Sequence, residues 1–207
     1  MPLTVGFDLD MTLIDPRPGM VAVMAELARR IGLPLDGGAF AANLGPPLDH
    51  NLRRLGVPEA DIPHAVAQFR TLYPGIVVPA TVAMPGAADA LAAVRAMGGR
   101  TLVVTGKYGP NAALHLAALG WAVDGLAGEL WAGGKAVALR AHGASIFVGD
   151  HVGDMIGAVA AGAVAVGVAT GSCDAAQLRA AGAEVVLADL TEFADWVASW
   201  PALAPDI

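Results

Sequence analysis

Three short apolar segments of this 207-residue chain each lead directly into a turn that is rich in oxygen-bearing side chains. The segments are 5–7, 102–104 and 146–148, and their turns are 8–12, 105–107 and 149–154. If the segments are parallel strands of one sheet, all three turns open at the same edge. Four carboxylates, a hydroxyl group and a lysine would then surround one point. Such a cluster is suited to a divalent cation and to the transfer of a phosphoryl group.

After residue 79 the chain alternates between short apolar strands and helices. The pattern predicts strands at 101–104, 145–148, 164–168 and 184–187, joining a first strand at 3–7. It predicts helices at about 87–97, 111–119, 135–142, 155–161, 175–180 and 192–200, and a turn-rich stretch at 123–134. Strands separated by helices favour right-handed crossovers and a parallel sheet. The expected fold class is therefore α/β.

The stretch between the first two of these turns has a different character. Apolar residues recur with helical spacing in 20–31, 44–55 and 62–72, and Gly- and Pro-containing breakers separate these runs. No alternation typical of a strand occurs between them. This stretch is predicted to be a small all-helical insert that follows the first strand.

Composition limits the class of protein and its partners. A chain of this length fits one α/β domain, alone or with a small insert. Its mean hydropathy of +0.58 reflects Ala, Val and Leu spread along the chain, with no stretch typical of a membrane span. The net charge of −7 disfavours a nucleic-acid partner. A single cysteine, Cys173, excludes an intrachain disulfide, and with no signal-peptide pattern at the start we expect a cytoplasmic protein.

Asp8 and Asp10 place two carboxylates in a tight turn after the first strand. A carboxylate can attack phosphorus to form an aspartyl phosphate. A second carboxylate two residues away can protonate the leaving oxygen and later deprotonate water. We assign Asp8 as the nucleophile and Asp10 as the acid and base. Taken alone, this pair would equally fit a turn in which the aspartates only cap the strand.

Asp150 and Asp154 follow another strand and begin a helix. Magnesium takes oxygen ligands and keeps substrate phosphate among them. Asp150 is the expected direct ligand, with Asp154 holding it or a metal-bound water. The alternative is a simple helix N-cap.

Thr105 and Gly106 offer a hydroxyl and an open backbone N–H for phosphate oxygens. Lys135, after two glycines, could neutralise both the nucleophile and the transferred group. The alternatives are a strand-end glycine turn and an exposed lysine, although a helix N-terminus disfavours a cation. Thr12, Gly106 and Lys107 are predicted to contact the phosphate or the leaving group. These purely structural alternatives are disfavoured because all of these groups occur together, each at the end of a predicted strand or helix.

These residues resemble the haloacid dehalogenase superfamily of phosphotransferases. The match spans the chain and comprises D-x-D-x-T at Asp8, Asp10 and Thr12, a hydroxyl motif at Thr105, a lysine motif at Lys135 and G-D-x-x-x-D at 149–154. The resemblance implies a Rossmann-like core formed by 1–16 and 80–207. It also implies a helical cap at 17–79, like that of the phosphoglycolate-phosphatase-like subgroup.

The resemblance further implies Mg²⁺ bound by Asp8, the backbone carbonyl of Asp10 and Asp150, and a phosphoaspartate at Asp8. Two departures stand out. Met11 replaces the glycine that is usual in the first motif, and the lysine motif lacks the prolines common in phosphoglycolate phosphatases. Asp10 argues against dehalogenation, and an insert without lysine argues against phosphonoacetaldehyde hydrolysis.

The leading hypothesis is a Mg²⁺-dependent phosphatase acting on a small phosphorylated metabolite. A phosphomutase of the same superfamily is the nearest alternative. A binding protein on the same fold is disfavoured because no reacting carboxylate is missing, and a response-regulator-like phosphoacceptor is disfavoured by Asp10 and the cap. Neither the substrate nor the oligomeric state can be deduced from the sequence.

Overall fold

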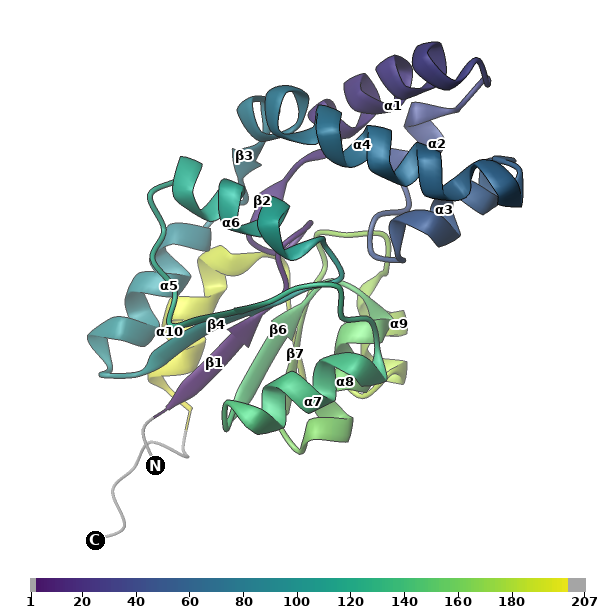
Figure 1. The fold of residues 1–207 in the computed structure, drawn as a ribbon. Helices are drawn as coiled ribbons and strands as arrows, with labels where there is room; N and C mark the ends of the chain where they lie inside the picture. Colours follow the sequence, from purple (N-terminus) through teal and green to yellow (C-terminus); the bar gives the residue numbers. More distant parts are fainter. Residues whose placement is uncertain (1–2, 201–207) are drawn as a thin grey trace, which may run out of the picture.

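Six parallel strands form the central sheet of the computed structural model, which describes residues 3–200 (Figure 1). Strand β1 (Thr4–Phe7) lies between β4 (Arg100–Val104) and β6 (Ile146–Gly149). The full strand order is β5-β4-β1-β6-β7-β8, with β5 at Gly125–Ala127, β7 at Val164–Val168 and β8 at Val185–Leu187. The expected α/β class is confirmed. Residues 1–2 and 201–207 of the expected core lie outside the described residues.

Helices cover both faces of the sheet (Figure 1). One face packs against α5 (Ala87–Ala96), α6 (Gly109–Ala118) and, after the short 3₁₀ helix η3 (Leu190–Glu192), α10 (Phe193–Ala198). The other packs against α7 (Gly133–Ala141), α8 (Val152–Ala161) and α9 (Ala175–Ala180).

Successive residues of a strand contribute to the two apolar cores in turn, because their side chains point to opposite faces of the sheet. Val148 belongs to the core under α5 and α10, and its neighbour Phe147 belongs to the core under α7 and α8. Both side chains are fully buried. A strand buried on both faces reads as a continuous apolar run, which is why the sequence identified it.

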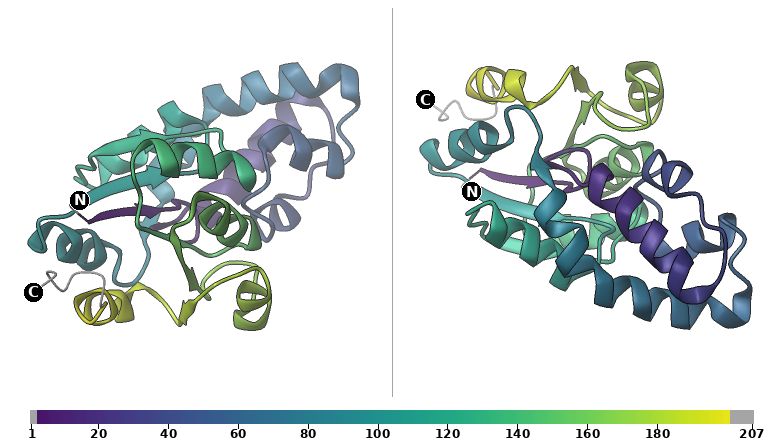
Figure 2. Two further views of the ribbon diagram at one scale, coloured as in Figure 1. Left: turned by 90° about the horizontal axis from the view of Figure 1, so that it is seen from below. Right: turned by 90° about the horizontal axis from the view of Figure 1, so that it is seen from above.

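The helical insert forms a cap with an apolar core of its own. Its helices are α1 (Arg17–Ile31), α2 (Gly37–Ala41), α3 (Leu48–Arg54), η1 (Glu59–Asp61), α4 (Ile62–Ile76) and η2 (Val78–Ala80). No strand interrupts the described chain between these helices. Figure 2 shows the cap at one end of the molecule, away from the start of β1. We call residues 17–79 the cap below.

The chain passes between core and cap through a two-stranded antiparallel ribbon. Strand β2 (Ile14–Asp15) leads into the cap, and β3 (Val82–Ala83) leads out of it. Two residues are too short a run to show periodicity, so the sequence did not reveal this ribbon. Helix α2 and strand β5 were also missed, because each lies in a short Gly-containing stretch that reads as a turn.

Met11 adopts a left-handed backbone conformation, with φ at +63°. Such a conformation favours glycine, so the departure noted at this position has a structural cost. The side chain is only 5% exposed and packs into the apolar core of the cap. The backbone carbonyl accepts a hydrogen bond from Thr170 Oγ1 at 2.5 Å. Burial of this large side chain therefore offsets the conformational cost.

None of the helices within residues 3–200 is both long enough and apolar enough to cross a membrane.

Two glycines at the ends of α5 provide a matched test of how the start of this helix packs against η3. Gly86 and Gly98 have φ of +76° and +70°, so alanine is strained at both. Only at Gly86 would the added Cβ overlap the backbone between Leu190 and Thr191, whereas at Gly98 it meets open space. We expect Gly98→Ala to reduce the free energy of unfolding by about 1 kcal/mol and Gly86→Ala by about 2 kcal/mol more. Urea denaturation measures both, and equal losses would contradict this packing.

Candidate active site

The three turns that follow β1, β4 and β6 meet at one edge of the sheet, beneath the cap. Asp8, Asp150 and Asp154 each offer a carboxylate oxygen, and these oxygens lie within 4.8 Å of one another. Asp8 comes from the end of β1, whereas Asp150 and Asp154 come from the turn after β6 and the first turn of α8. Parallel pairing of β1 with β6 thus creates the acidic cluster.

Lys135, in the first turn of α7, inserts its ammonium group into this cluster. Its Nζ atom donates to Asp8 Oδ1 at 2.8 Å and to Asp154 Oδ1 at 2.6 Å. The residue is 1% exposed. Burial acts to lower the pKa of Lys135, but the Asp154 and Asp8 carboxylates outweigh it and raise that pKa above its usual value. The lysine therefore stays charged.

Asp150 is held by Thr12, whose Oγ1 donates to Asp150 Oδ1 at 2.9 Å. The Thr12 hydroxyl thus donates to a carboxylate. Its contact with the phosphate stays a prediction. Burial raises the pKa of Asp150 well above its usual range, and the Asp154 and Asp8 carboxylates add to this. Asp154 Oδ2 also accepts from the backbone N–H of His151 at 3.1 Å, which forms a capping box at the start of α8.

Asp10 lines the same small pocket as the acidic cluster but pairs with Lys107, the second lysine of the chain. Its Oδ2 lies 2.9 Å from Lys107 Nζ, and its buried Oδ1 has no hydrogen-bond partner among the described residues. Burial raises the pKa of Asp10, while Lys107 works in the opposite direction. The two aspartates of the first turn thus have different partners and different environments.

Thr105 and Gly106 line the same small pocket as Asp8 and Asp150. Thr105 is 1% exposed, and its Oγ1 accepts a hydrogen bond from the backbone N–H of Lys107 at 3.3 Å. A Cβ at Gly106 would come within 3.0 Å of the Gly45 carbonyl oxygen, which belongs to the cap. Glycine therefore lets the cap approach this turn closely.

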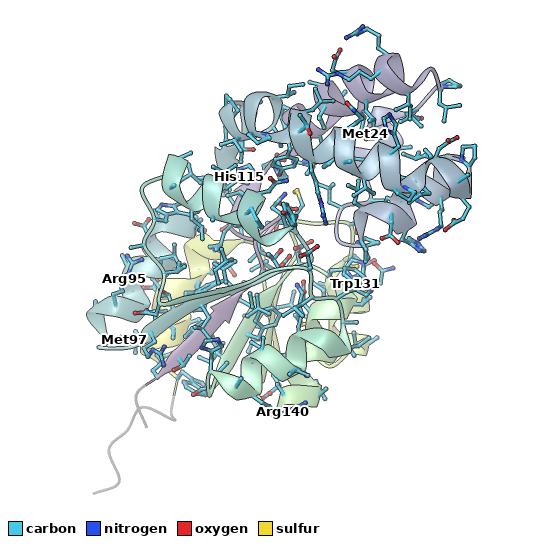
Figure 3. The ribbon with its side chains drawn as sticks, viewed as in Figure 1. Met24, Arg95, Met97, His115, Trp131 and Arg140 are labelled. Atoms are coloured by element: carbon cyan, nitrogen blue, oxygen red, sulfur yellow. The ribbon has the colours of Figure 1, made fainter. Side chains whose placement is uncertain are left out.

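Two residues that the sequence did not single out for function extend the Asp10–Lys107 pair. Lys107 Nζ donates to Tyr73 Oη at 2.5 Å, and Tyr73 Oη lies 2.8 Å from His115 Nε2. Tyr73 comes from α4 of the cap, and His115 lies on α6, where that helix faces the cap (Figure 3). Since the lysine can only donate, the Tyr73 hydroxyl accepts from it and shares its second hydrogen bond with the imidazole of His115. Residues 42 positions apart carry no sequence signal of this contact.

A second contact between cap and core involves Arg70 of α4. Its guanidinium lies 3.9 Å from the ring centroid of Tyr108, and its Nη2 is 2.8 Å from Glu129 Oε1. Trp131 packs against Gly45 of the cap, beneath α3 (Figure 3). No sequence motif singled out Arg70 or Glu129.

The family model described as haloacid dehalogenase-like hydrolase matches residues 5–158, which include all three turns. The chain belongs to this family. A second model, HAD-hydrolase-like, matches residues 132–193. The membership inferred from the motifs is thereby confirmed, and the protein is an enzyme, a phosphatase of the haloacid dehalogenase-like family.

Similar proteins cover nearly the whole chain. It is 30% identical to the probable phosphatase IndB of Dickeya dadantii, over 92% of this chain and 91% of that protein. Its fold is similar to a predicted phosphatase from Clostridium acetobutylicum, with a TM-score of 0.83, 20% identity and coverage of 97% and 100%. A haloacid dehalogenase-like hydrolase from Streptococcus pneumoniae gives a TM-score of 0.81 at 22% identity, covering 95% of this chain and 98% of that one.

The neutral state of His115 in this haloacid dehalogenase-like hydrolase has a measurable consequence. Burial, with the Lys107 cation adding to it, lowers the pKa of His115 from 6.5 to about 3. Between those values the unfolded chain binds a proton that the folded chain does not, so acidification favours unfolding. From pH 7.5 to pH 5 we expect His115 to account for about 1–2 kcal/mol of lost stability.

The variant His115→Gln keeps a polar group near the Nε2 position but cannot titrate in this range. Urea denaturation at both pH values should show a smaller acid-induced loss in the variant than in the wild type. An identical loss in the two proteins would show that His115 is protonated in the folded state.

Proposed function

We propose that this protein is a Mg²⁺-dependent phosphatase that hydrolyses a small phosphate monoester through a phosphoaspartate at Asp8. The observation that supports this most directly is the division of labour between two aspartates. Asp8 lies in an acidic cluster and pairs with Lys135. Asp10 lies beside this cluster and pairs with Lys107. A nucleophile and an acid–base group need this difference in environment.

The residues present fit a divalent cation. In their ionised forms Asp8, Asp10, Asp150 and Asp154 would carry four negative charges against the two positive charges of Lys107 and Lys135, an excess of two that a divalent cation would balance. The donors are oxygens, the ligands that Mg²⁺ prefers. We propose that Asp8, the backbone carbonyl of Asp10 and Asp150 would hold the ion, with Asp154 supporting them. When bound, the ion would neutralise phosphate oxygens and lower the barrier to attack.

In the proposed first step, Asp8 attacks phosphorus and the bond from phosphorus to the ester oxygen breaks. Asp10 donates its proton to that oxygen, so the alcohol leaves neutral. Burial, which raises the pKa of Asp10, favours the protonated form needed here. Lys135, which already contacts Asp8, would offset negative charge on the transferred group, and Thr105 and the Gly106 N–H, which line the same pocket, would bind its oxygens.

In the second step, Asp10 takes a proton from water, and the resulting hydroxide attacks phosphorus of the acyl phosphate. The bond from phosphorus to Asp8 breaks, phosphate leaves, and both aspartates return to their starting states. The cap excludes other water from the reacting atoms. Tyr73 and Arg70 bring the cap into contact with the core beside Asp10.

The proposed substrate is a small phosphorylated metabolite, because the space between cap and core is enclosed on both sides. We propose a cytoplasmic setting, which suits the single buried thiol of Cys173. A phosphomutase would return the phosphoryl group to a sugar phosphate instead of to water, and release of free phosphate without a bisphosphate activator separates the two.

Asp8→Asn tests the nucleophile. Acetyl phosphate, with Mg²⁺, is a suitable substrate because it places almost no demand on the leaving-group side. We expect the variant to lose phosphate release by about 10³-fold or more, since an amide cannot form the acyl phosphate. Asp61→Asn removes an exposed carboxylate from the cap and serves as the control. Comparable turnover in the Asp8→Asn variant would remove the phosphoaspartate from the mechanism.

Asp150→Asn tests the cation by a measurement that needs no turnover. With EDTA present, we expect the variant to melt at a higher temperature than the wild type, because it no longer buries an acidic group and no longer has the repulsion from Asp154 and Asp8. Addition of millimolar Mg²⁺ should raise the melting temperature of the wild type and affect the variant much less. Equal Mg²⁺ responses in the two proteins would mean that the ion binds elsewhere.

A further inference from the structure

We propose, on the basis of the phosphatase function above, that the leaving group this site accepts is an uncharged alcohol with an apolar, ring-sized body. The geometry does not suit a leaving group that carries a carboxylate or a second phosphate. Three features favour an uncharged leaving group: the cavity beside Asp10, its apolar walls, and the pairing of the charged groups that line it.

A cavity of about 300 Å³ lies between the cap and the core. It shares Asp10, Gly106 and Lys107 with the pocket of about 20 Å³ that holds Asp8 and the other carboxylates. The small pocket has room for little beyond the phosphoryl group. A phosphate ester bound there must therefore place the rest of its body in the larger cavity, next to the proposed acid Asp10.

The cap side of this cavity is lined mainly by apolar and aromatic side chains. Phe40, Phe69 and Tyr73 form a continuous aromatic series, with ring centroids 5.9 Å and 5.5 Å apart. Met20 and, from the core, Trp131 extend this surface. Such walls gain from contact with an apolar ring and give nothing to a hydrated ion.

The two cationic side chains that line the cavity are both already paired. Lys107 is bound to Asp10, and Arg70 is bound to Glu129 at 2.8 Å. Asp49 also lines the cavity and is itself paired with Arg53, so no charged group of the lining lacks a partner of opposite charge. A carboxylate entering this space would either remain unpaired or displace Asp10 or Glu129 from its partner. Both outcomes penalise binding.

Two features indicate where one neutral polar group of the leaving group would bind. The buried Nε of Arg70 has no hydrogen-bond acceptor among residues 3–200, and the buried amide of Asn111 also lines the cavity. A hydroxyl or carbonyl oxygen can accept from such donors without adding charge. We therefore expect tolerance of one uncharged oxygen on the apolar body.

The test compares benzyl phosphate with 4-carboxybenzyl phosphate, which differ only by a charged group on the ring. We expect kcat/KM in the presence of Mg²⁺ to be at least about 10-fold higher for benzyl phosphate. Equal values, a preference for the carboxylated ester, or hydrolysis of neither would overturn the proposal. Acetyl phosphate distinguishes failure of the leaving-group proposal from failure of the phosphatase function. If acetyl phosphate also releases no phosphate, the proposed phosphatase function fails as well.

Glu129→Gln tests whether the paired state of Arg70 sets this preference. The variant leaves Arg70 with an uncompensated charge that faces the cavity, so the ratio of the two kcat/KM values should fall by about fivefold or more. Glu26→Gln breaks an exposed ion pair in the cap and should leave the ratio unchanged. A ratio that Glu129→Gln does not alter would overturn the assignment of selectivity to this ion pair.

Discussion

The ammonium group of Lys135, buried between Asp8 and Asp154, is the interaction on which the site depends. Parallel strands bring their carboxyl ends to one edge, and in this chain that edge collects acidic side chains. Without an internal cation, burial and mutual repulsion would drive these groups to take up protons. Lys135 donates to the Asp8 carboxylate and holds it in position. It compensates only part of the charge of the ionised cluster, which supports the proposed divalent-cation site.

A second, separate ion pair gives Asp10 an environment different from that of Asp8. The chain has only two lysines, and each is buried against one of these two aspartates. Lys107 also receives Tyr73 from the cap, so the environment of Asp10 is completed only when cap and core are together. The contact between cap and core and the proposed acid–base group, Asp10, thus share the same few atoms. The partner of Asp8, the proposed nucleophile, lies within the core.

The sequence was sufficient for the sheet and for the convergence of its turns, because buried parallel strands are short apolar runs with a fixed relation to the turns that follow them. It was insufficient where contacts join distant segments. The link between Tyr73 and His115, and that between Arg70 and Glu129, cross from cap to core and leave no local pattern. Which carboxylate oxygens contact Lys135 likewise depends on how α7 is seated, which propensity does not determine.

Met11 connects the catalytic turn to the cap directly. Among the buried side chains of the cap's apolar core it alone comes from the turn that carries Asp8 and Asp10; the others lie between residues 20 and 77. Any outward movement of the cap must therefore either remove the Met11 side chain from the apolar core of the cap or move the turn with it. The cap and the turn that carries Asp8 and Asp10 are therefore coupled through Met11. A glycine at this position would leave the two parts free to move independently.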